Sequence, residues 1–355
     1  MDYPSHLRKL LSLTLQANAS DLHIAVGNYP TLRITGRLVP LLKEKRVTSE
    51  EARGLVFAFL TEEQRARFLT EKEIDFSYNF ENQARFRVNI FNESAEVAIA
   101  CRLIPTKIQT LEELNLPSLL HHFTRHTQGF VLITGPSGHG KSTTLAALID
   151  EINHTRSDHI ITIEDPIEYV FHADRSIIAQ REVYQDTLSF ARALKSTFRE
   201  DPNVIMVGEM RDPETMSIAI SAAETGHLVF ATLHTNSAGQ TIHRIVDSFA
   251  PEQQNQIRAQ VSASLLGVLS QRLIPRIKGG LIPACEIMIN NPAVANLVRE
   301  NKIHEIPLVI ETSADIGMIS LNRSLADLVR RREISLDNAL LYSLNPSELR
   351  VLVKK

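Results

Sequence analysis

The chain has 355 residues, which is more than one ordinary hydrophobic core organises, so its length predicts two domains. Its composition, 43% hydrophobic and 22% charged, is that of a globular protein, and a net charge of -3 does not favour a nucleic-acid partner. The two cysteines lack CxxC spacing, which argues against a zinc site or a disulfide framework. The sequence resembles no signal peptide at its start and has no apolar run near the roughly 20 residues of a membrane span, so we expect a cytoplasmic protein.

The first 105 residues predict a small α+β domain. Residues 1–20 have the pattern of an amphipathic helix. Two short helices should follow, because Thr48-x-x-Glu51 and Thr61-x-x-Gln64 both have the spacing of a capping box.

Two strands are expected at the end of this domain. In residues 84–90 apolar side chains alternate with polar ones, which places Arg85 and Arg87 on one face of a strand. Residues 96–104 form the second candidate strand and carry Arg102. Residues 106–117, polar and bracketed by prolines, then predict a linker to a second domain over 118–355.

The second domain has the pattern of an α/β fold. Short apolar runs alternate with helical segments, as in a buried parallel sheet, and they occupy residues 130–134, 159–163, 204–207 and 228–233. After about residue 290 the pattern is mostly helical, most clearly over 320–332 and 335–344.

A phosphate-binding loop follows the first of these runs. Glycines in the spacing GxxxxGK[ST] let the backbone curl so that N–H groups point at phosphate oxygens, and a following helix presents its positive end to the same anion. A chance match is disfavoured because a strand-like run precedes the motif and a helical pattern, 143–152, follows it. The expected ATP-binding residues are Gly135, Pro136, Ser137, Gly138, His139, Gly140, Lys141, Ser142 and Thr143. Lys141 should reach the β and γ phosphates, and Ser142 should ligate Mg²⁺.

Hydrolysis requires carboxylates near the γ-phosphate, and two apolar runs end in them. Glu209 follows residues 204–207 and could hold Mg²⁺, through water. Glu164 follows residues 159–163 and could orient or deprotonate the attacking water. Either one alone could equally be a solvated strand end, but two after a P-loop favour a hydrolytic site.

His234 ends the last apolar run, at the place of a γ-phosphate sensor. A structural role for this histidine is the alternative.

These elements, in this order, resemble the superfamily of type II/IV secretion and type IV pilus ATPases. The acidic box of the superfamily is similar to residues 163–169, its Gly-Glu form of the Walker B motif to Gly208-Glu209, and its histidine box to residues 225–236. Within it, the chain is most similar to the pilus retraction motors of the PilT family. That similarity extends nearly from end to end and includes residues 19–23, 85–89, 180–183 and 271–275.

The chain departs from the retraction motors at two positions. Their C-terminal signature, Ala-Ile-Arg-Asn-Leu-Ile-Arg-Glu, is matched by residues 293–300 except for two Ile-to-Val changes and Ala295 in place of arginine. His139 stands where a small hydroxyl residue is usual. Residues 276–283 lack the tetracysteine insertion of the extension motors, and the N-terminal domain begins at once, without their extra domain; both differences favour retraction.

The resemblance implies a homohexamer, each subunit having a PAS-like N-terminal domain and a RecA-like ATPase domain with C-terminal helices. It implies that arginines of the small domain act at the nucleotide, with Arg85 and Arg102 the stronger candidates and solvation of a strand face the alternative. A membrane platform protein is the implied partner, with an extension ATPase or an accessory paralogue as further partners, and the protein would lie at the inner face of the cytoplasmic membrane through them. Alternatives are an accessory retraction paralogue, a secretion or conjugation ATPase, a DNA-translocating motor and a non-catalytic regulatory binder.

Overall fold

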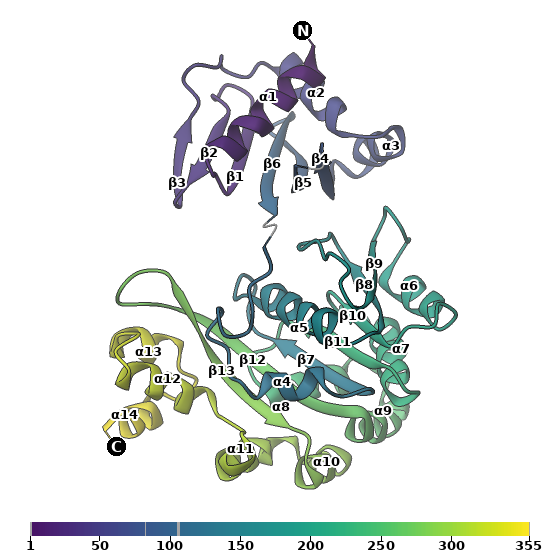
Figure 1. Cartoon of the computed structure of the whole chain (residues 1–355), viewed down its shortest axis with the longest axis vertical. Coiled ribbons are helices and arrows are strands. Elements are labelled where there is room, and N and C mark those ends of the chain that lie inside the picture. The colour runs from purple at the N-terminus through teal and green to yellow at the C-terminus, as the bar shows by residue number, and fades with distance from the viewer. Residues whose placement is uncertain (1, 82, 105–106, 355) are drawn as a thin grey trace. The chain divides into compact units, whose positions relative to one another are not determined.

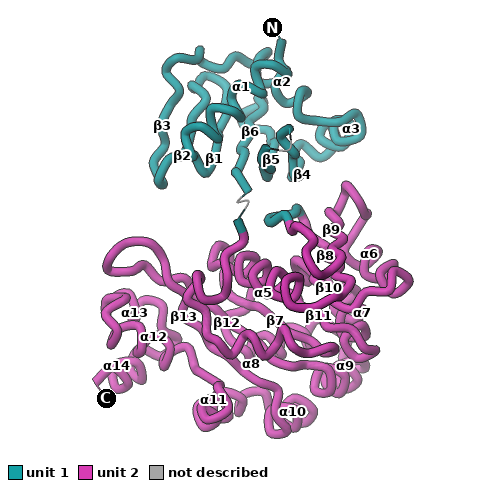
Figure 2. The backbone as a smooth tube through the Cα atoms, viewed as in Figure 1, with its two compact units in different colours: residues 1–107, 166–170 teal, residues 108–165, 171–355 magenta. Residues whose placement is uncertain are grey.

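The computed structural model describes residues 2–81, 83–104 and 107–354, and the chain divides into two compact units (Figure 2). The first unit comprises residues 1–107 together with 166–170, and the second comprises 108–165 and 171–355. Residue 106, with which the linker is expected to begin, lies outside the described residues. Residue 107 falls in the first unit, and residues 108–117 of the expected linker cluster with the second.

The first unit is a six-stranded antiparallel sheet in the order β3-β2-β1-β6-β5-β4, with three helices (Figure 1). Along the chain its elements are α1 (Tyr3–Gln16), β1 (Asp21–Ala25), β2 (Thr31–Ile34), β3 (Arg37–Pro40), α2 (Ser49–Phe59), α3 (Glu62–Glu71), β4 (Glu73–Phe80), β5 (Ala84–Glu93) and β6 (Glu96–Ile104). The predicted N-terminal helix and the two predicted strands are confirmed, with β5 extending three residues beyond the prediction.

Local sequence explains where the helices of this unit begin. Thr61 forms a complete capping box with Gln64 at the start of α3, as predicted. At α2 only half of the box forms: the Thr48 side chain accepts from the Glu51 N–H, but the Glu51 carboxylate lies 3.1 Å from His6 of α1. The predicted α2 helix is therefore correct, although its glutamate binds another helix instead of the cap.

The second unit contains a seven-stranded sheet in the order β13-β12-β7-β11-β10-β8-β9. Neighbouring strands are parallel except for the β12–β13 pair. Its strands are β7 (Gly129–Thr134), β8 (His159–Glu164), β9 (Ile177–Glu182), β10 (Val204–Val207), β11 (Leu228–Leu233), β12 (Leu265–Pro275) and β13 (Leu281–Ile289). Its helices are α4 (Leu120–Thr124), α5 (Lys141–Thr155), α6 (Phe190–Thr197), α7 (Pro213–Glu224), α8 (Ala238–Asp247), α9 (Pro251–Ser264), α10 (Pro292–Arg299), α11 (Ile306–Thr312), α12 (Leu321–Arg330), α13 (Leu336–Tyr342) and α14 (Pro346–Lys354), with short 3-10 turns at Ile303–Glu305 and Ala314–Ile316.

The four predicted parallel strands are confirmed as β7, β8, β10 and β11. Every residue of β7, β10 and β11 is buried, which is why each strand is a continuous apolar run rather than an alternating one. The fold class predicted from the sequence is correct: an α/β chain with a small α+β unit followed by a larger unit built on a parallel sheet.

The prediction did not include β9, β12 or β13. β9 lies at the edge of the sheet and ends in polar residues, so its apolar signal is weak. β12 passes from apolar residues into Ser270, Gln271 and Arg272, and this polar stretch interrupts the pattern that identified the other strands.

The C-terminal helices are confirmed, and Ser320 and Ser335 cap the first turns of α12 and α13. The helices α12–α14 form a small core of their own with the end of β12 and the start of β13, built around Ile274, Ile282 and Leu325. In the part of the chain that the structure describes, no helix combines the length and apolarity needed to cross a bilayer.

Candidate active site

The P-loop lies between the interior strand β7 and helix α5, as the motif predicts. Three of its glycines have positive φ angles, 144° at Gly135, 76° at Gly138 and 81° at Gly140. Side-chain-bearing residues avoid these conformations, so the glycines allow the turn that a phosphate cradle requires. Gly140 is also the N-terminal cap of α5.

Strand β12 lies against this loop. A Cβ atom on Gly135 would lie 2.3 Å from the Gln271 carbonyl oxygen. The Gln271 side chain is buried and donates to the His139 carbonyl at 2.7 Å, while its Oε1 accepts from the Thr144 hydroxyl at 2.8 Å. One glutamine of β12 therefore binds both the loop and the first turn of α5.

The P-loop lysine is held inside its own loop. Lys141 Nζ donates to the carbonyls of Gly135 and Pro136, each at 3.0 Å, and lies 3.1 Å from His234 Nδ1. An ammonium group can only donate, so His234 Nδ1 must accept and the ring proton resides on Nε2. That Nε2 lies 3.2 Å from a carboxylate oxygen of Glu209. Lysine, histidine and glutamate thus form a continuous chain across the site.

The sheet order explains this arrangement. The strands β7, β11, β10 and β8 are neighbours and run parallel, so their carboxyl ends share one edge. The P-loop leaves β7, His234 follows β11, Glu209 follows β10, and Glu164 ends β8. The edge continues beyond the strands through a bond from Gly208 N–H to the Ile163 carbonyl at 2.8 Å. This is the edge at which open α/β sheets bind ligands.

Glu209 is poised as an ionised group. Burial alone would raise the pKa of Glu209, but the hydrogen bond and charge of Arg211, 2.9 Å away, together with His234, lower it below the ordinary value. An ionised carboxylate fits the oxygen-ligand preference of Mg²⁺. The described residues include no group of three or more His, Cys, Asp or Glu side chains that could hold a metal by themselves, so phosphate oxygens and water would have to complete the coordination.

Glu164 is buried and held in place by neutral donors. Its Oε1 accepts from the Thr162 hydroxyl at 2.7 Å and from the Gln180 amide at 3.1 Å, the latter across the β8–β9 pair. Gly208 fits beside it, because a Cβ atom there would lie 3.4 Å from the Glu164 Cα and 3.2 Å from the Ile163 carbonyl oxygen. The glycine of the Gly-Glu pair thus allows β10 to pass close to the end of β8.

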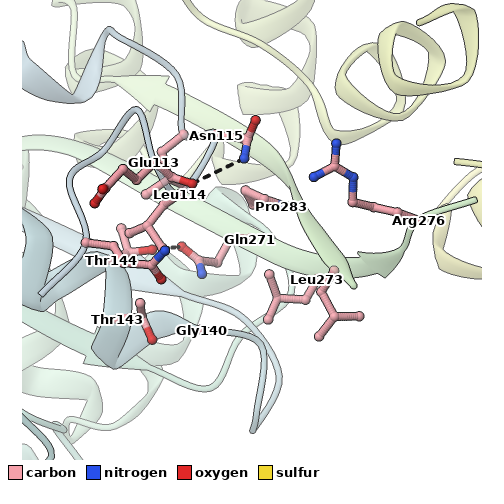
Figure 3. A pocket seen from close by; sticks show the side chains of 13 residues that line it. Glu113, Leu114, Asn115, Gly140, Thr143, Thr144, Gln271, Leu273, Arg276 and Pro283 are labelled. Atoms are coloured by element: carbon pink, nitrogen blue, oxygen red, sulfur yellow. Dashed lines mark hydrogen bonds between the residues drawn. The ribbon is translucent and has the colours of Figure 1, made fainter. Parts of the chain in front are cut away.

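A cavity of about 320 Å³ opens beside the P-loop (Figure 3). Its lining combines Gly140, Thr143 and Thr144 of the loop and α5 with residues of the expected linker and of the β12–β13 pair. The other lining residues are Gln109, Glu113, Leu114, Asn115, Leu116, Gln271, Leu273, Arg276, Leu281 and Pro283.

Comparison with known proteins decides the family. The family model for type II/IV secretion system proteins matches residues 4–311. The chain belongs to this family of secretion system proteins. Among its relatives, PilT of Pseudomonas aeruginosa, named a type IV pilus retractation ATPase, is 44% identical over 94% of this chain and 96% of its own length.

Other relatives and solved structures are similar to this chain over most of its length. A twitching motility protein of Neisseria gonorrhoeae is 46% identical over 92% of this chain and 87% of its own. The crystal structure of the pilus retraction motor PilT with bound ADP superposes with a TM-score of 0.90, at 43% identity and over 97% of this chain and 98% of the other. The ATPase DotB of Legionella pneumophila, at 28% identity, superposes with a TM-score of 0.85 over 95% of each chain.

The arginines expected at the nucleotide belong to the first unit of this secretion-family chain. Arg85 donates to the Ser77 hydroxyl, and Arg102 lies 2.9 Å from Asp21 with most of its side chain exposed. As predicted, Arg85 and Arg87 share one face of β5. Their action on a nucleotide stays a prediction.

Arg87 has acidic partners inside the same unit. It lies 2.6 Å from Asp75 on the neighbouring strand and 3.3 Å from Glu168. Glu168 belongs to the acidic box, so this box contributes to both units: Glu164 to the second, and residues 166–170 to the first.

The sequence places Gln180 and Gln271 in segments similar to the family and indicates no role for either residue. The structure places Gln180 on Glu164, and Gln271 between the P-loop and α5. Both residues lie on strands that the sequence pattern does not predict. Without those strands, the sequence gives no indication of what the two side chains contact.

We predict that Gly135→Ala weakens nucleotide binding at least about tenfold, because the new methyl group would displace the loop from β12. A fluorescent ADP analogue titrated into the purified chain measures the effect. Gly279→Ala is the matched control, since Gly279 also has a positive φ, 88°, but has no atom within 4 Å of an added Cβ. Wild-type affinity in Gly135→Ala would show that the close approach of β12 does not constrain the loop.

Proposed function

We propose that this chain is the ATP-hydrolysing subunit of a homohexameric motor that powers type IV pilus retraction. One observation carries the proposal: the P-loop, His234, Glu209 and Glu164 occupy successive strand ends on a single sheet edge. Similarity over 94% of the chain to a protein named as a pilus retraction ATPase supports the choice of this motor.

In the proposed site, the P-loop N–H groups and the start of α5 bind the phosphates of ATP. Lys141 exchanges the Gly135 and Pro136 carbonyls for β and γ phosphate oxygens, which its flexible side chain allows. Ser142 and Glu209 would hold Mg²⁺, Glu209 through water, and the ion would neutralise phosphate charge when bound. The cavity at Gly140 and Thr143 offers space next to the phosphates for the ribose and base.

Glu164 acts on the attacking water in this proposal. Its carboxylate is buried, and Thr162 and Gln180 fix it on one side, so it keeps a defined orientation during the reaction. His234 senses the γ-phosphate: its Nδ1 now accepts from Lys141, and movement of that lysine to the nucleotide would release it. Arg85 and Arg102 of the small domain supply additional positive charge, a contribution worth about 10³–10⁵ in rate where an arginine is supplied to such sites.

The C-terminal signature departs from that of the retraction motors mainly at Ala295. The conservative positions Val294 and Val298 are buried in the core of the second unit, whereas Ala295 is only half-buried on α10. The Arg-to-Ala change therefore leaves the packing of the helix intact and alters its accessible side. An accessory retraction ATPase is the second candidate, because PilU of Pseudomonas aeruginosa is 38% identical over 98% of this chain.

Force would come from domain closure on ATP and opening after hydrolysis, with the segment that joins the two units as the hinge. The motor would act at the inner face of the cytoplasmic membrane through a membrane platform protein of the pilus. An extension ATPase or an accessory paralogue would work on the same machine.

Lys141→Ala should abolish tight ATP binding, because the substitution removes the charge that the loop directs at the phosphates. Equilibrium binding of a fluorescent ATP analogue measures this loss. Lys278→Ala removes an exposed lysine elsewhere and serves as the control. Equal affinities in the two variants would contradict the assignment of the P-loop.

Glu164→Gln should retain ATP binding but lose about 10²–10⁴ in hydrolysis rate, because the amide keeps the shape of the side chain and cannot take a proton from water. Phosphate release under single-turnover conditions measures the chemical step. Glu252→Gln, at an exposed helix end, is the matched control. Hydrolysis at the wild-type rate in Glu164→Gln would refute its catalytic role.

Deletion of the gene in its host tests the motor function. Retraction by this chain predicts loss of twitching together with excess surface pili, and neither the Glu164→Gln nor the Lys141→Ala gene should complement the deletion. Normal pilus numbers with only weakened twitching would instead favour the accessory ATPase.

A further inference from the structure

His139 occupies the P-loop but makes its side-chain contacts outside it. The backbone N–H of Leu273, on β12, donates to His139 Nδ1 at 2.9 Å. The His139 carbonyl accepts from Gln271 at 2.7 Å. Two hydrogen bonds, one through its side chain and one through its backbone, therefore attach His139 to Leu273 and Gln271 of the same strand.

The direction of the side-chain bond determines the protonation state of the ring. A backbone N–H can only donate, so Nδ1 must be unprotonated, and the imidazole is neutral when the bond forms. Burial lowers the pKa of His139, and the charges of Arg272 on β12 and Lys141 on α5 lower it further. The neutral form is thus favoured by its surroundings as well as by the bond.

The same ring faces the C-terminal helices. The centroid of the Tyr342 ring, at the end of α13, lies 6.2 Å from that of His139 in an edge-to-face arrangement. Arg272 donates to the Tyr342 carbonyl at 2.9 Å and approaches Asn236, two residues after His234, at 3.2 Å. His139 is therefore packed between the strand and a helix of the C-terminal core, and Arg272 and Tyr342 are the charged and titratable groups facing it from those elements.

We infer that His139 is a positioning residue of the nucleotide site: its neutral imidazole fastens the P-loop to β12, and nucleotide affinity depends on that bond. The inference rests on the proposed function only in taking the P-loop as the nucleotide site. A phosphate cradle works when its N–H groups are held in place before the anion arrives, and the bonds to Leu273 and Gln271 fix the loop immediately before Gly140.

The sign of the pH effect separates this role from simple charge attraction. Protonated His139 presents an N–H to the Leu273 N–H, so the bond is lost and affinity falls as pH drops through the pKa of His139. If the ring acted mainly as a positive charge near phosphate, affinity would instead rise on acidification. The bond faces β12 and the ring packs against Tyr342, so we expect the first effect to prevail.

The test uses the full chain and N-methylanthraniloyl-ADP, with EDTA present to remove divalent cations. Affinity is measured at about pH 8 and about pH 5.5, on either side of the ordinary histidine range. Three proteins are compared: wild type, His139→Leu, which has similar size and no acceptor, and His139→Asn, whose Oδ1 replaces Nδ1 as acceptor but does not titrate. Thermal unfolding of each protein checks that it is folded.

At pH 8 we expect His139→Leu to bind about tenfold more weakly and His139→Asn to remain within about twofold of wild type. Between the two pH values the wild type should lose at least about threefold more affinity than His139→Asn. Equal affinities of His139→Leu and wild type, or parallel pH profiles of wild type and His139→Asn, would overturn the inference. If His139→Leu does not fold, the comparison with His139→Asn still decides the matter. Absence of binding by the wild type at both pH values would instead refute the P-loop assignment itself.

Discussion

The candidate site depends on the parallel pairing of four buried strands. Because β7, β11, β10 and β8 are neighbours that run in one direction, residues separated by about a hundred positions in sequence meet on one edge. The pairing requires strands covered on both faces, and β7, β10 and β11, which are buried throughout and almost entirely apolar, satisfy that requirement. The polar residues that follow these strands lie at the edge of the sheet, so their charges gather there and not in the hydrophobic core.

That concentration of charge is balanced within the site. Lys141 is compensated by two carbonyls and by His234, and Glu209 is compensated by His234 and Arg211. A nucleotide with its cation would offer the lysine stronger anionic partners and the glutamate a stronger cationic one, so both could leave the histidine. His234, which follows β11, therefore links the phosphate-binding lysine to Glu209, which follows β10. Binding of the phosphates would change the contacts of both residues.

The sequence predicts the candidate residues of this site because the signals are local. A continuous apolar run identifies a buried strand, and a polar residue at or just after its end is then expected at the edge of the sheet, as for Glu164, Glu209 and His234. Their roles stay predictions. The contacts of Gln180 and Gln271 were not predictable in the same way, since they depend on which strand pairs with β8 and with β7. Strand order is a long-range property, and β9 and β12 also lacked the uninterrupted apolar pattern of the other strands.

The role of His139 becomes visible only once β12, a strand that the sequence does not predict, is in place. In the sequence alone it is an unusual residue in a familiar loop, with no feature that selects a role. Once β12 lies beside β7, the loop has a neighbour with a backbone donor at Leu273, and a histidine can accept from it where the ring also meets Tyr342. The same strand continues into the core of α12–α14 through Ile274. The P-loop and the C-terminal helices are thus attached to one strand.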